Sequence, residues 1–387
     1  PPRMLESQFE NIRPFFDNEA AEAATSLAKV IDCAGLLAPL VGKENAADLA
    51  KNMLQVDSIS DFQDDLTYPF LEALIESTTD GVTLGYSSGA FEKDLESPTL
   101  HLTNHRDIVL DPSLVNVARM GSGFPSTEIG IGDNLLSHKW LEDLVRLNRC
   151  FIVRRGGGPR ERWESSLLVA TYIRHVVKNG SSVWLAQKEG RAKDGRDSTS
   201  PALIRMLISE GGKEAWEKLN VKPVSISYEW DPCDYMKVRE LLIKENEGEY
   251  LKEPGEDEMS MASGMTGWKG RIHLEFCKTI PWKEVEGKRT ERAIAELVDR
   301  AIYTGYKIFP NQVIAADRLG LEELVGCASE IKVTDEDRTL FSNRIDKVVE
   351  EVGTNIASKE KIQKTFCEIM VQPLLAKYKV SLETKSF

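Results

Sequence analysis

The chain has 387 residues. This is too long for a single small hydrophobic core, so we expect more than one structural unit. Its 41% hydrophobic and 29% charged residues are ordinary for a globular protein. The 49 basic and 62 acidic residues give a net charge of −13, which argues against general binding to nucleic acid or to an anionic membrane.

Residues 1–80 have apolar residues at helical spacing and many good helix formers, as in DNEAAEAATSLAKV and ENAADLAKNMLQV. TTDGVT, residues 78–83, is typical of a turn and indicates a boundary. We therefore predict an N-terminal helical domain over residues 1–80.

From residue 81 to about 280, short apolar runs alternate with helical stretches. The runs are TLHLT (99–103), TEIGIG (127–132), CFIVRR (150–155), SVWLAQ (182–187), KPVSISY (222–228) and RIHLEF (271–276). This alternation predicts an α/β fold with a mostly parallel central sheet flanked by helices. The acidic stretch 241–268 is predicted to be an exposed insertion.

The remaining residues return to a helical pattern. We predict that the α/β domain covers residues 81–315 and that a helical C-terminal extension covers residues 316–387. The six scattered cysteines form no C-x-x-C pair, which indicates reduced thiols in a cytosolic setting and no zinc motif. No apolar run approaches 18 residues, so no membrane span is expected.

The most informative segment is NHRDIVLDP, residues 104–112, which directly follows a predicted strand. Ligands in open α/β sheets bind beyond the carboxyl ends of strands. His105 is therefore a candidate general base for a hydroxyl group, with Asp107 or Asp111 fixing its tautomer. Alternatively, these residues only cap the following helix.

Two further segments carry positive charge at strand ends. FIVRRGGGPRER, residues 151–162, offers Arg154 and Arg155, whose guanidinium groups match phosphate oxygens, but it contains no Walker motif. WLAQKEGRAKDGRD, residues 184–197, has a second set of polar candidates, which are Glu189, Gly190, Arg191, Lys193 and Arg196. Taken alone, the first segment is at least as typical of a flexible turn with solvated arginines, and the second is more typical of a charged surface loop. In VKPVSISYEWDPCD, residues 221–234, a packing role is the default.

Taken in order, the four segments resemble those of the glycerolipid acyltransferase superfamily, the glycerol-3-phosphate and 1-acylglycerol-3-phosphate O-acyltransferases. That family has an Asn-His-x4-Asp block, an apolar-Arg block, an E-G-x-R block and a Pro-apolar strand. NHRDIVLD, FIVRRG, KEGRAKDGR and KPVSISYE look like these blocks in turn. The resemblance spans about residues 99–280, and the layout is similar to that of the plastid-type glycerol-3-phosphate enzymes.

The resemblance implies transfer of a fatty acyl group from acyl-CoA or acyl carrier protein to glycerol-3-phosphate or a lyso-phospholipid such as lysophosphatidate. His105 would be the general base, and Glu189 would contact the acceptor hydroxyl. The residues implied for phosphate binding are Arg154, Arg155 and Arg191, with Gly190 in the same loop and with Lys193 and Arg196 as second choices. No metal or other cofactor is implied. The expected location is cytoplasmic or stroma-like, with at most peripheral membrane contact.

One position departs from the family pattern. The expected aspartate falls on Leu110, and the carboxylate comes one residue later, at Asp111. One residue rotates a helical side chain by roughly 100°. Either a loop absorbs the extra residue, or Asp107 takes over; we favour Asp111.

An anionic donor needs positive charge, and an acyl chain needs an apolar groove. We predict that a basic cluster steers the donor; it consists of Arg146, Arg149, Arg154, Arg155 and Arg160. The space between the N-terminal helices and the sheet is one candidate for this groove, whose location the sequence does not define.

Two alternatives compete with this interpretation. GYSSG, residues 85–89, matches the G-x-S-x-G elbow of serine hydrolases and acyltransferases, with Ser87 as the nucleophile. However, its surroundings indicate a turn before a charged segment rather than a strand-turn-helix. The second alternative is an inactive acyl- or lipid-binding protein, which the displaced aspartate would permit.

Overall fold

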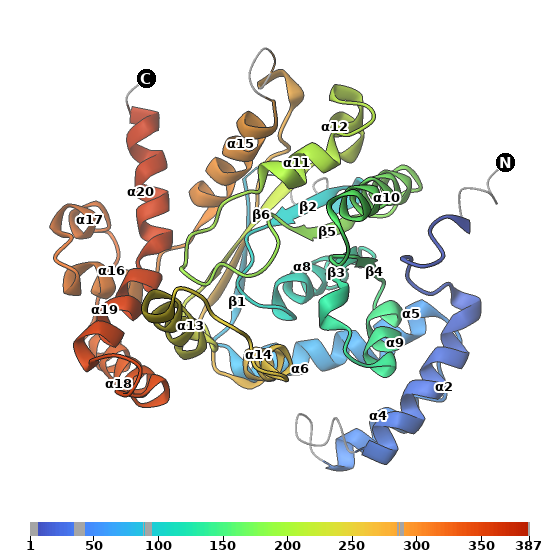
Figure 1. Cartoon of the computed structure of the whole chain (residues 1–387), viewed down its shortest axis with the longest axis horizontal. Helices are drawn as coiled ribbons and strands as arrows, with labels where there is room; N and C mark the ends of the chain where they lie inside the picture. The colour runs from blue at the N-terminus through green and yellow to red at the C-terminus, as the bar shows by residue number, and fades with distance from the viewer. Residues whose placement is uncertain are drawn as a thin grey trace.

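The computed structural model describes residues 7–34, 43–87, 89, 95–284, 286 and 290–385. Its centre is a seven-stranded sheet in the order β1-β7-β6-β2-β5-β3-β4 (Figure 1). Within the described residues, the strands are β1 (Val82–Tyr86), β2 (Leu100–Thr103), β3 (Glu128–Gly132), β4 (Cys150–Val153), β5 (Val183–Ala186), β6 (Lys222–Tyr228) and β7 (Ile272–Phe276). All neighbours pair in parallel except β6 and β7. The predicted α/β fold with a mostly parallel sheet is confirmed.

Helices cover both faces of the sheet and extend beyond it on two sides. Those before and within the sheet are α2 (Asp17–Ala34), α4 (Lys43–Met53), α5 (Ile59–Phe62), the π-helix η1 (Gln63–Thr67), α6 (Tyr68–Thr78), α8 (Leu110–Met120), η2 (Asp133–Leu135), α9 (Lys139–Leu147), α10 (Pro159–Lys178), α11 (Pro201–Leu207), α12 (Lys213–Leu219), α13 (Asp234–Glu247) and α14 (Glu256–Thr266). Those after the sheet are η3 (Trp282–Glu284), α15 (Thr290–Gly305), α16 (Pro310–Arg318), α17 (Glu322–Cys327), α18 (Asp335–Val352), α19 (Lys359–Met370) and α20 (Gln372–Lys385).

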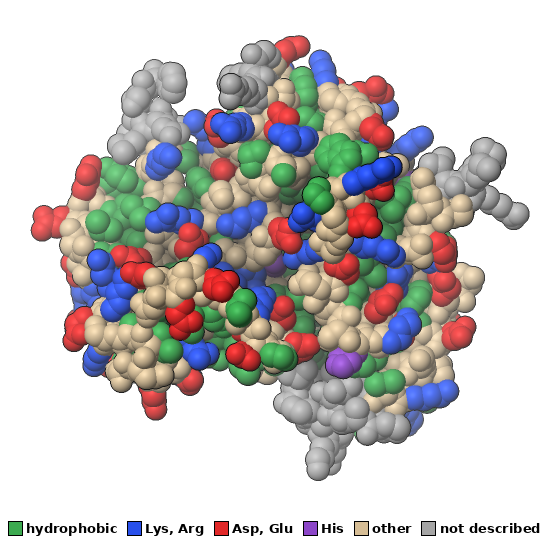
Figure 2. Space-filling view, in the orientation of Figure 1, with side chains coloured by type: hydrophobic (Ala, Val, Ile, Leu, Met, Phe, Trp, Pro, Cys, Tyr) green, Lys and Arg blue, Asp and Glu red, His purple; other side chains and the backbone are tan. Residues whose placement is uncertain are grey.

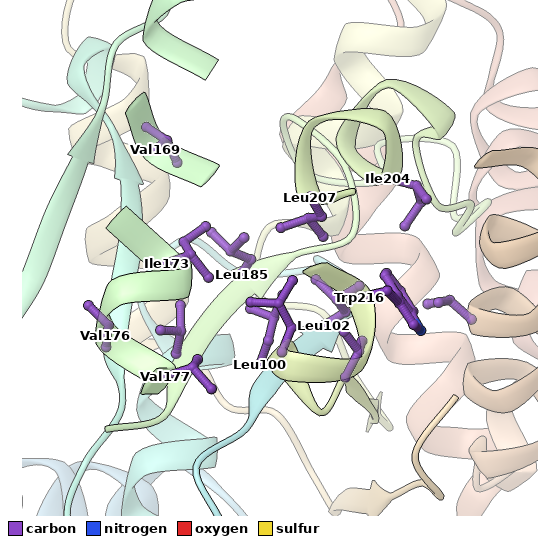
Figure 3. Close-up of a cluster of buried hydrophobic side chains, with 14 of the residues drawn as sticks. Leu100, Leu102, Val169, Ile173, Val176, Val177, Leu185, Ile204, Leu207 and Trp216 are labelled. Carbon is purple, nitrogen blue, oxygen red and sulfur yellow. The ribbon is translucent and has the colours of Figure 1, made fainter. Parts of the chain in front are cut away.

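The two faces of β2 enter different cores, because successive side chains of a strand point to opposite sides. Leu100 and Leu102 pack with apolar residues of α10, α11, α12 and α15. Figure 3 shows this core, with Trp216 of α12 beside the strand leucines. The opposite face of the sheet packs against α8, through Leu114 and Val115. All four residues of β2 are buried, which fixes the position of the chain that follows it.

Two further apolar clusters join the outer helices to this centre. The N-terminal helices share a core with α9, in which Leu27, Phe62 and Leu147 are buried. Helices α16 to α20 share another core with α13, which contains Val238 and Phe366. In Figure 1 these helix groups lie on opposite sides of the sheet. A helical N-terminal part and a helical C-terminal stretch are confirmed, whereas domain boundaries after residues 80 and 315 stay predictions.

Two local predictions are wrong. Residues 82–86 form β1, although this segment was expected to be a turn; β1 is an edge strand, and its half-exposed side chains produce no apolar run. The stretch 241–268 is not merely an exposed insertion, because it includes the end of α13 and the whole of α14. Ser260 and Gly264 of α14 are buried. Among the described residues, no helix has both the length and the apolar character needed to cross a bilayer.

Candidate functional site

The candidate residues lie beyond the carboxyl ends of three strands, β2, β4 and β5. Because β6, β2, β5, β3 and β4 run parallel, their carboxyl ends meet at one edge of the sheet, here called the carboxyl edge. His105 follows β2, Glu189 and Arg191 follow β5, and Arg154 and Arg155 follow β4. Figure 2 shows Lys and Arg side chains grouped across the middle of the face that it presents.

The imidazole of His105 is hydrogen-bonded to a fully buried carboxylate. Its Nδ1 lies 2.8 Å from Oδ2 of Asp111, and the two side chains are 14% and 0% exposed. The His105 and Trp184 rings form a T-shaped contact, with 6.0 Å between ring centroids. This contact with Asp111 leaves Nε2 as the ring nitrogen available for a proton from a substrate.

Asp107 has a different role, because it caps α8. Its Oδ1 accepts hydrogen bonds from the backbone N–H groups of Val109 (2.9 Å) and Leu110 (2.8 Å). Burial, together with the neighbouring Asp111 carboxylate, raises the pKa of Asp107. Residues 106–109 form a loop, and α8 starts only at Leu110, so the loop absorbs the additional residue of the motif.

The loop between His105 and α8 is held by Arg106, whose side chain is only 13% exposed. Its guanidinium group donates to Asp197 Oδ2 at 2.6 Å and to the Gly195 carbonyl at 2.9 Å. The Arg106 carbonyl accepts a 2.8 Å hydrogen bond from the Lys237 ammonium group. Burial opposes the charge of Arg106, but Asp197 and other acidic neighbours outweigh this effect and raise the pKa of Arg106. Sequence analysis missed this anchor, since its partners are distant along the chain.

The loop after β5 is tied directly to the candidate base. The Ala192 N–H donates to the His105 carbonyl at 2.9 Å, so the residues flanking Ala192 are held next to the histidine loop. Gly190 has φ +74°, a left-handed conformation that favours glycine, and this explains the glycine after Glu189 by backbone geometry. The Arg191 side chain is 5% exposed, and its Nη2 lies 3.9 Å from Asp257 Oδ1 of α14.

Arg155 and Glu189 meet at this edge. Arg155 Nη1 lies 3.4 Å from Glu189 Oε1, and the two side chains are 32% and 72% exposed. The backbone N–H of Arg155 donates to Asp133 Oδ1 at 3.1 Å. An ion pair this open to water is weak, so an anion can compete for the guanidinium group at little cost. Arg154 is exposed.

The two second-choice basic residues are arranged differently from each other. The Lys193 ammonium group is hydrogen-bonded to Glu240 of α13, and burial lowers the pKa of Lys193. The Arg196 side chain is 75% exposed, with Asp194 at 3.9 Å. Lys193 is therefore already neutralised by a protein carboxylate, and Arg196 faces solvent.

The predicted basic cluster does not form one surface. Arg154, Arg155 and Arg160 follow β4 at the carboxyl edge, whereas Arg146 and Arg149 precede it at the opposite, amino edge. Arg146 is buried and donates to the carbonyl of Arg13. Of the five arginines in this predicted cluster, only the three beyond β4 can therefore face a ligand at the carboxyl edge.

A cavity of about 650 Å³ lies at the amino edge, between the N-terminal helices and the sheet. Its lining includes Phe9, Phe124, Glu128 and Arg149. This is the candidate place for an acyl groove, but His105 is not among the lining residues. The five residues of β3 separate the two edges by about 16 Å, so the cavity does not adjoin the candidate base.

Ser87 does not contact an imidazole. It follows β1, and its hydroxyl group donates to Glu275 Oε1 at 2.7 Å. Glu275 in turn lies 3.3 Å from His273 Nε2, so the carboxylate stands between the serine and the histidine. A helix after the GYSSG segment would begin on residues outside those described.

No metal cluster is found in the described part of the chain, where no three His, Cys, Asp or Glu side chains are placed to hold an ion together. No protein-family model and no curated protein matches the sequence.

Among solved structures, the chain is similar to the 1-acyl-sn-glycerophosphate (LPA) acyltransferase PlsC from Thermotoga maritima. The match has 14% sequence identity and a TM-score of 0.34, and it covers 74% of this chain and 94% of that one. At this identity and TM-score, the match decides neither the activity nor the substrate of this chain.

Proposed function

We propose that this chain is an O-acyltransferase that moves a fatty acyl group from a thioester to a hydroxyl group of a glycerol phosphate. The observation that carries the proposal is the 2.8 Å hydrogen bond between His105 and the buried Asp111, at a sheet edge that also has Arg155 and Arg191. A histidine oriented by a carboxylate is a general base, and arginine side chains bind phosphate.

In this mechanism, Nε2 of His105 accepts the proton of the acceptor hydroxyl while the oxygen attacks the thioester carbonyl carbon. The carbon–sulfur bond breaks, and the departing thiolate takes the proton back from the imidazolium. Asp111 stabilises the imidazolium and keeps the proton of the neutral ring on Nδ1. A positioned general base contributes typically 10²–10⁴-fold in rate.

For the acceptor, Arg155 is the preferred phosphate ligand, because its pairing with the exposed Glu189 is weak. Arg191 is the second ligand, although its side chain is nearly buried beside Asp257. Released from Arg155, Glu189 can accept a hydrogen bond from a hydroxyl group of the acceptor. Glycerol-3-phosphate and lysophosphatidate both offer a phosphate and a hydroxyl group, and contact with a membrane would be peripheral.

The donor is acyl-CoA or acyl carrier protein, both of which are anionic. Arg154 and Arg160 lie beyond β4 and are exposed, with Arg160 paired to Glu164 at 2.8 Å on the helix surface. Exposed charges of this kind steer association rather than hold a ligand tightly. We therefore assign these two arginines to the encounter with the donor.

The test is turnover of labelled acyl-CoA and acyl carrier protein by the purified chain, with glycerol-3-phosphate, lysophosphatidate and glycerol as acceptors. Mass spectrometry identifies the product. His105→Ala is expected to lower kcat by roughly 10²–10⁴-fold. Ser87→Ala is the matched control and is expected to retain activity.

The two alternatives give different results. An inactive Ser87→Ala variant beside an active His105→Ala variant would establish a serine enzyme instead. Lipid binding without transfer from either donor to any acceptor would establish a binding protein.

A further inference from the structure

The Asp111 carboxylate receives unequal support at its two oxygens. Oδ2 lies 2.8 Å from Nδ1 of His105 and accepts from the backbone N–H groups of Arg106 (2.7 Å) and Asp107 (3.0 Å). Oδ1 accepts a 2.8 Å hydrogen bond from the Tyr228 hydroxyl group. Because Asp111 is 0% exposed, bulk water does not reach either oxygen.

We propose that Tyr228 is a positioning residue that fixes the rotation of the Asp111 carboxylate and thereby holds the tautomer and ring of His105. A carboxylate rotates about its Cβ–Cγ bond over a broad range of angles unless each oxygen is held by a partner. Tyr228 supplies that partner for Oδ1. This inference rests on the proposed role of His105 as the base.

The backbone places Tyr228 accurately with respect to His105. Tyr228 is the last residue of β6, which pairs with β2, the strand that leads to His105. Asn104 joins the two strands beyond their last pair: its amide group donates to the Ile226 carbonyl at 2.9 Å and accepts from the Ile226 N–H at 2.8 Å. The hydroxyl of Tyr228 and the ring of His105 are therefore carried by one rigid unit.

The Tyr228 hydroxyl remains a hydrogen-bond donor at ordinary pH. Burial, reinforced by the charge of Asp111, raises the pKa of Tyr228 well above its usual value. A protonated phenol next to a buried carboxylate can donate in one direction only. The support of Asp111 is thus constant while His105 gains and loses its proton.

The chain contains a matched control pair. At the amino edge, the Tyr172 hydroxyl group donates to Glu128 Oε2 at 2.5 Å, and both groups are largely buried. Tyr172→Phe therefore removes the same kind of hydrogen bond from the same fold, without touching the carboxyl edge. A general loss of stability would affect both variants alike.

The experiment compares Tyr228→Phe and Tyr172→Phe in the full chain by steady-state kinetics, thermal unfolding and ¹⁵N NMR of the histidine rings. His105→Gln identifies the His105 signals. Tyr228→Phe is expected to lower kcat about 5- to 50-fold with KM within about twofold, because the base is misoriented while the substrate sites are intact. Its His105 ¹⁵N shifts should move toward a mixture of tautomers. Tyr172→Phe should change neither readout.

The NMR result separates this proposal from the proposed reaction. If the wild-type chain transfers no acyl group, the reaction is wrong, and the tautomer of His105 in Tyr228→Phe still decides the positioning role. Unchanged His105 shifts together with a kcat within twofold of wild type would overturn the proposal. So would equal changes in both phenylalanine variants.

Discussion

The replacement Asp111→Asn separates the charge of the proposed dyad from its geometry. The asparagine side chain keeps one oxygen for the backbone N–H groups of Arg106 and Asp107, which lie 2.7 and 3.0 Å from Oδ2 in the wild type. Its amide nitrogen then faces the Tyr228 hydroxyl group, which can accept as well as donate. The loop is therefore expected to keep its shape, and the variant to fold.

The loss in rate follows from the missing charge. Two unit charges about 4 Å apart attract by about 4 kcal/mol at an effective dielectric constant of about 20. The imidazolium formed on His105 during the reaction loses this attraction, whereas the neutral ring of the resting state does not. At about 1.4 kcal/mol per factor of ten, kcat should fall roughly 10³-fold. Single-turnover measurements with saturating donor and acceptor give the relevant rate.

Asp107→Asn is the control, since its carbonyl oxygen can still accept from the N–H groups of Val109 and Leu110 and cap α8. Its kcat should stay within about threefold of wild type, because Asp107 caps the helix and does not contact His105. An inactive Asp107→Asn variant beside an active Asp111→Asn variant would refute the assignment of Asp111 as the partner of His105.

Two further predictions concern binding and stability. Arg155→Ala should raise KM for a phosphate-bearing acceptor roughly 10- to 100-fold, which corresponds to the free energy of one charged hydrogen bond, with little change in kcat. Arg160→Ala removes an arginine from the exposed helix surface and is the control: it should leave this KM unchanged in the same assay. Burial raises the pKa of Asp299 from its ordinary 3.8 to about 6, so the folded state holds this proton more tightly and stability falls as pH rises through that interval. Asp299→Asn, which keeps an acceptor for Thr199, should therefore be about 1–3 kcal/mol more stable than wild type in urea unfolding at pH 7.5 and no more stable near pH 4.

The sheet was predictable because most of its strands, namely β2, β4, β5 and β6, are buried along nearly their whole length. Such strands appear in the sequence as continuous apolar runs, and all six predicted runs contain strands, from β2 to β7. The joint placement of His105, Arg155 and Glu189 followed from the same pattern, since parallel strands bring their carboxyl ends to one edge. The edge strand β1 carries no such signal, because half-exposed positions need no apolar residues.

Contacts between distant segments were not predictable. The basic residues between 146 and 160 look like one cluster along the chain, but β4 carries the chain from one edge of the sheet to the other between Arg149 and Arg154. Tyr228 is the last residue of a buried strand, where packing is the usual role of an aromatic residue, and only the structure brings its hydroxyl group to Asp111. The covering of Asp107 by α14 depends on Gly264, where a Cβ atom would lie 2.1 Å from Asp107 Oδ2.

In the histidine motif, the backbone conformation between His105 and Asp111 matters more for their contact than the number of residues that separates them. One additional residue inside a helix would rotate the aspartate by roughly 100° away from the imidazole. In this chain the addition falls within residues 106–109, which are not helical, and Asp107 sets the start of α8 at Leu110. Asp111 therefore lies in the first turn and reaches back to the loop, so that His105 and the two following backbone N–H groups converge on one oxygen. The displaced aspartate was the sequence feature that allowed the chain to be interpreted as an inactive binding protein. Because the loop absorbs the displacement, this feature no longer supports that interpretation.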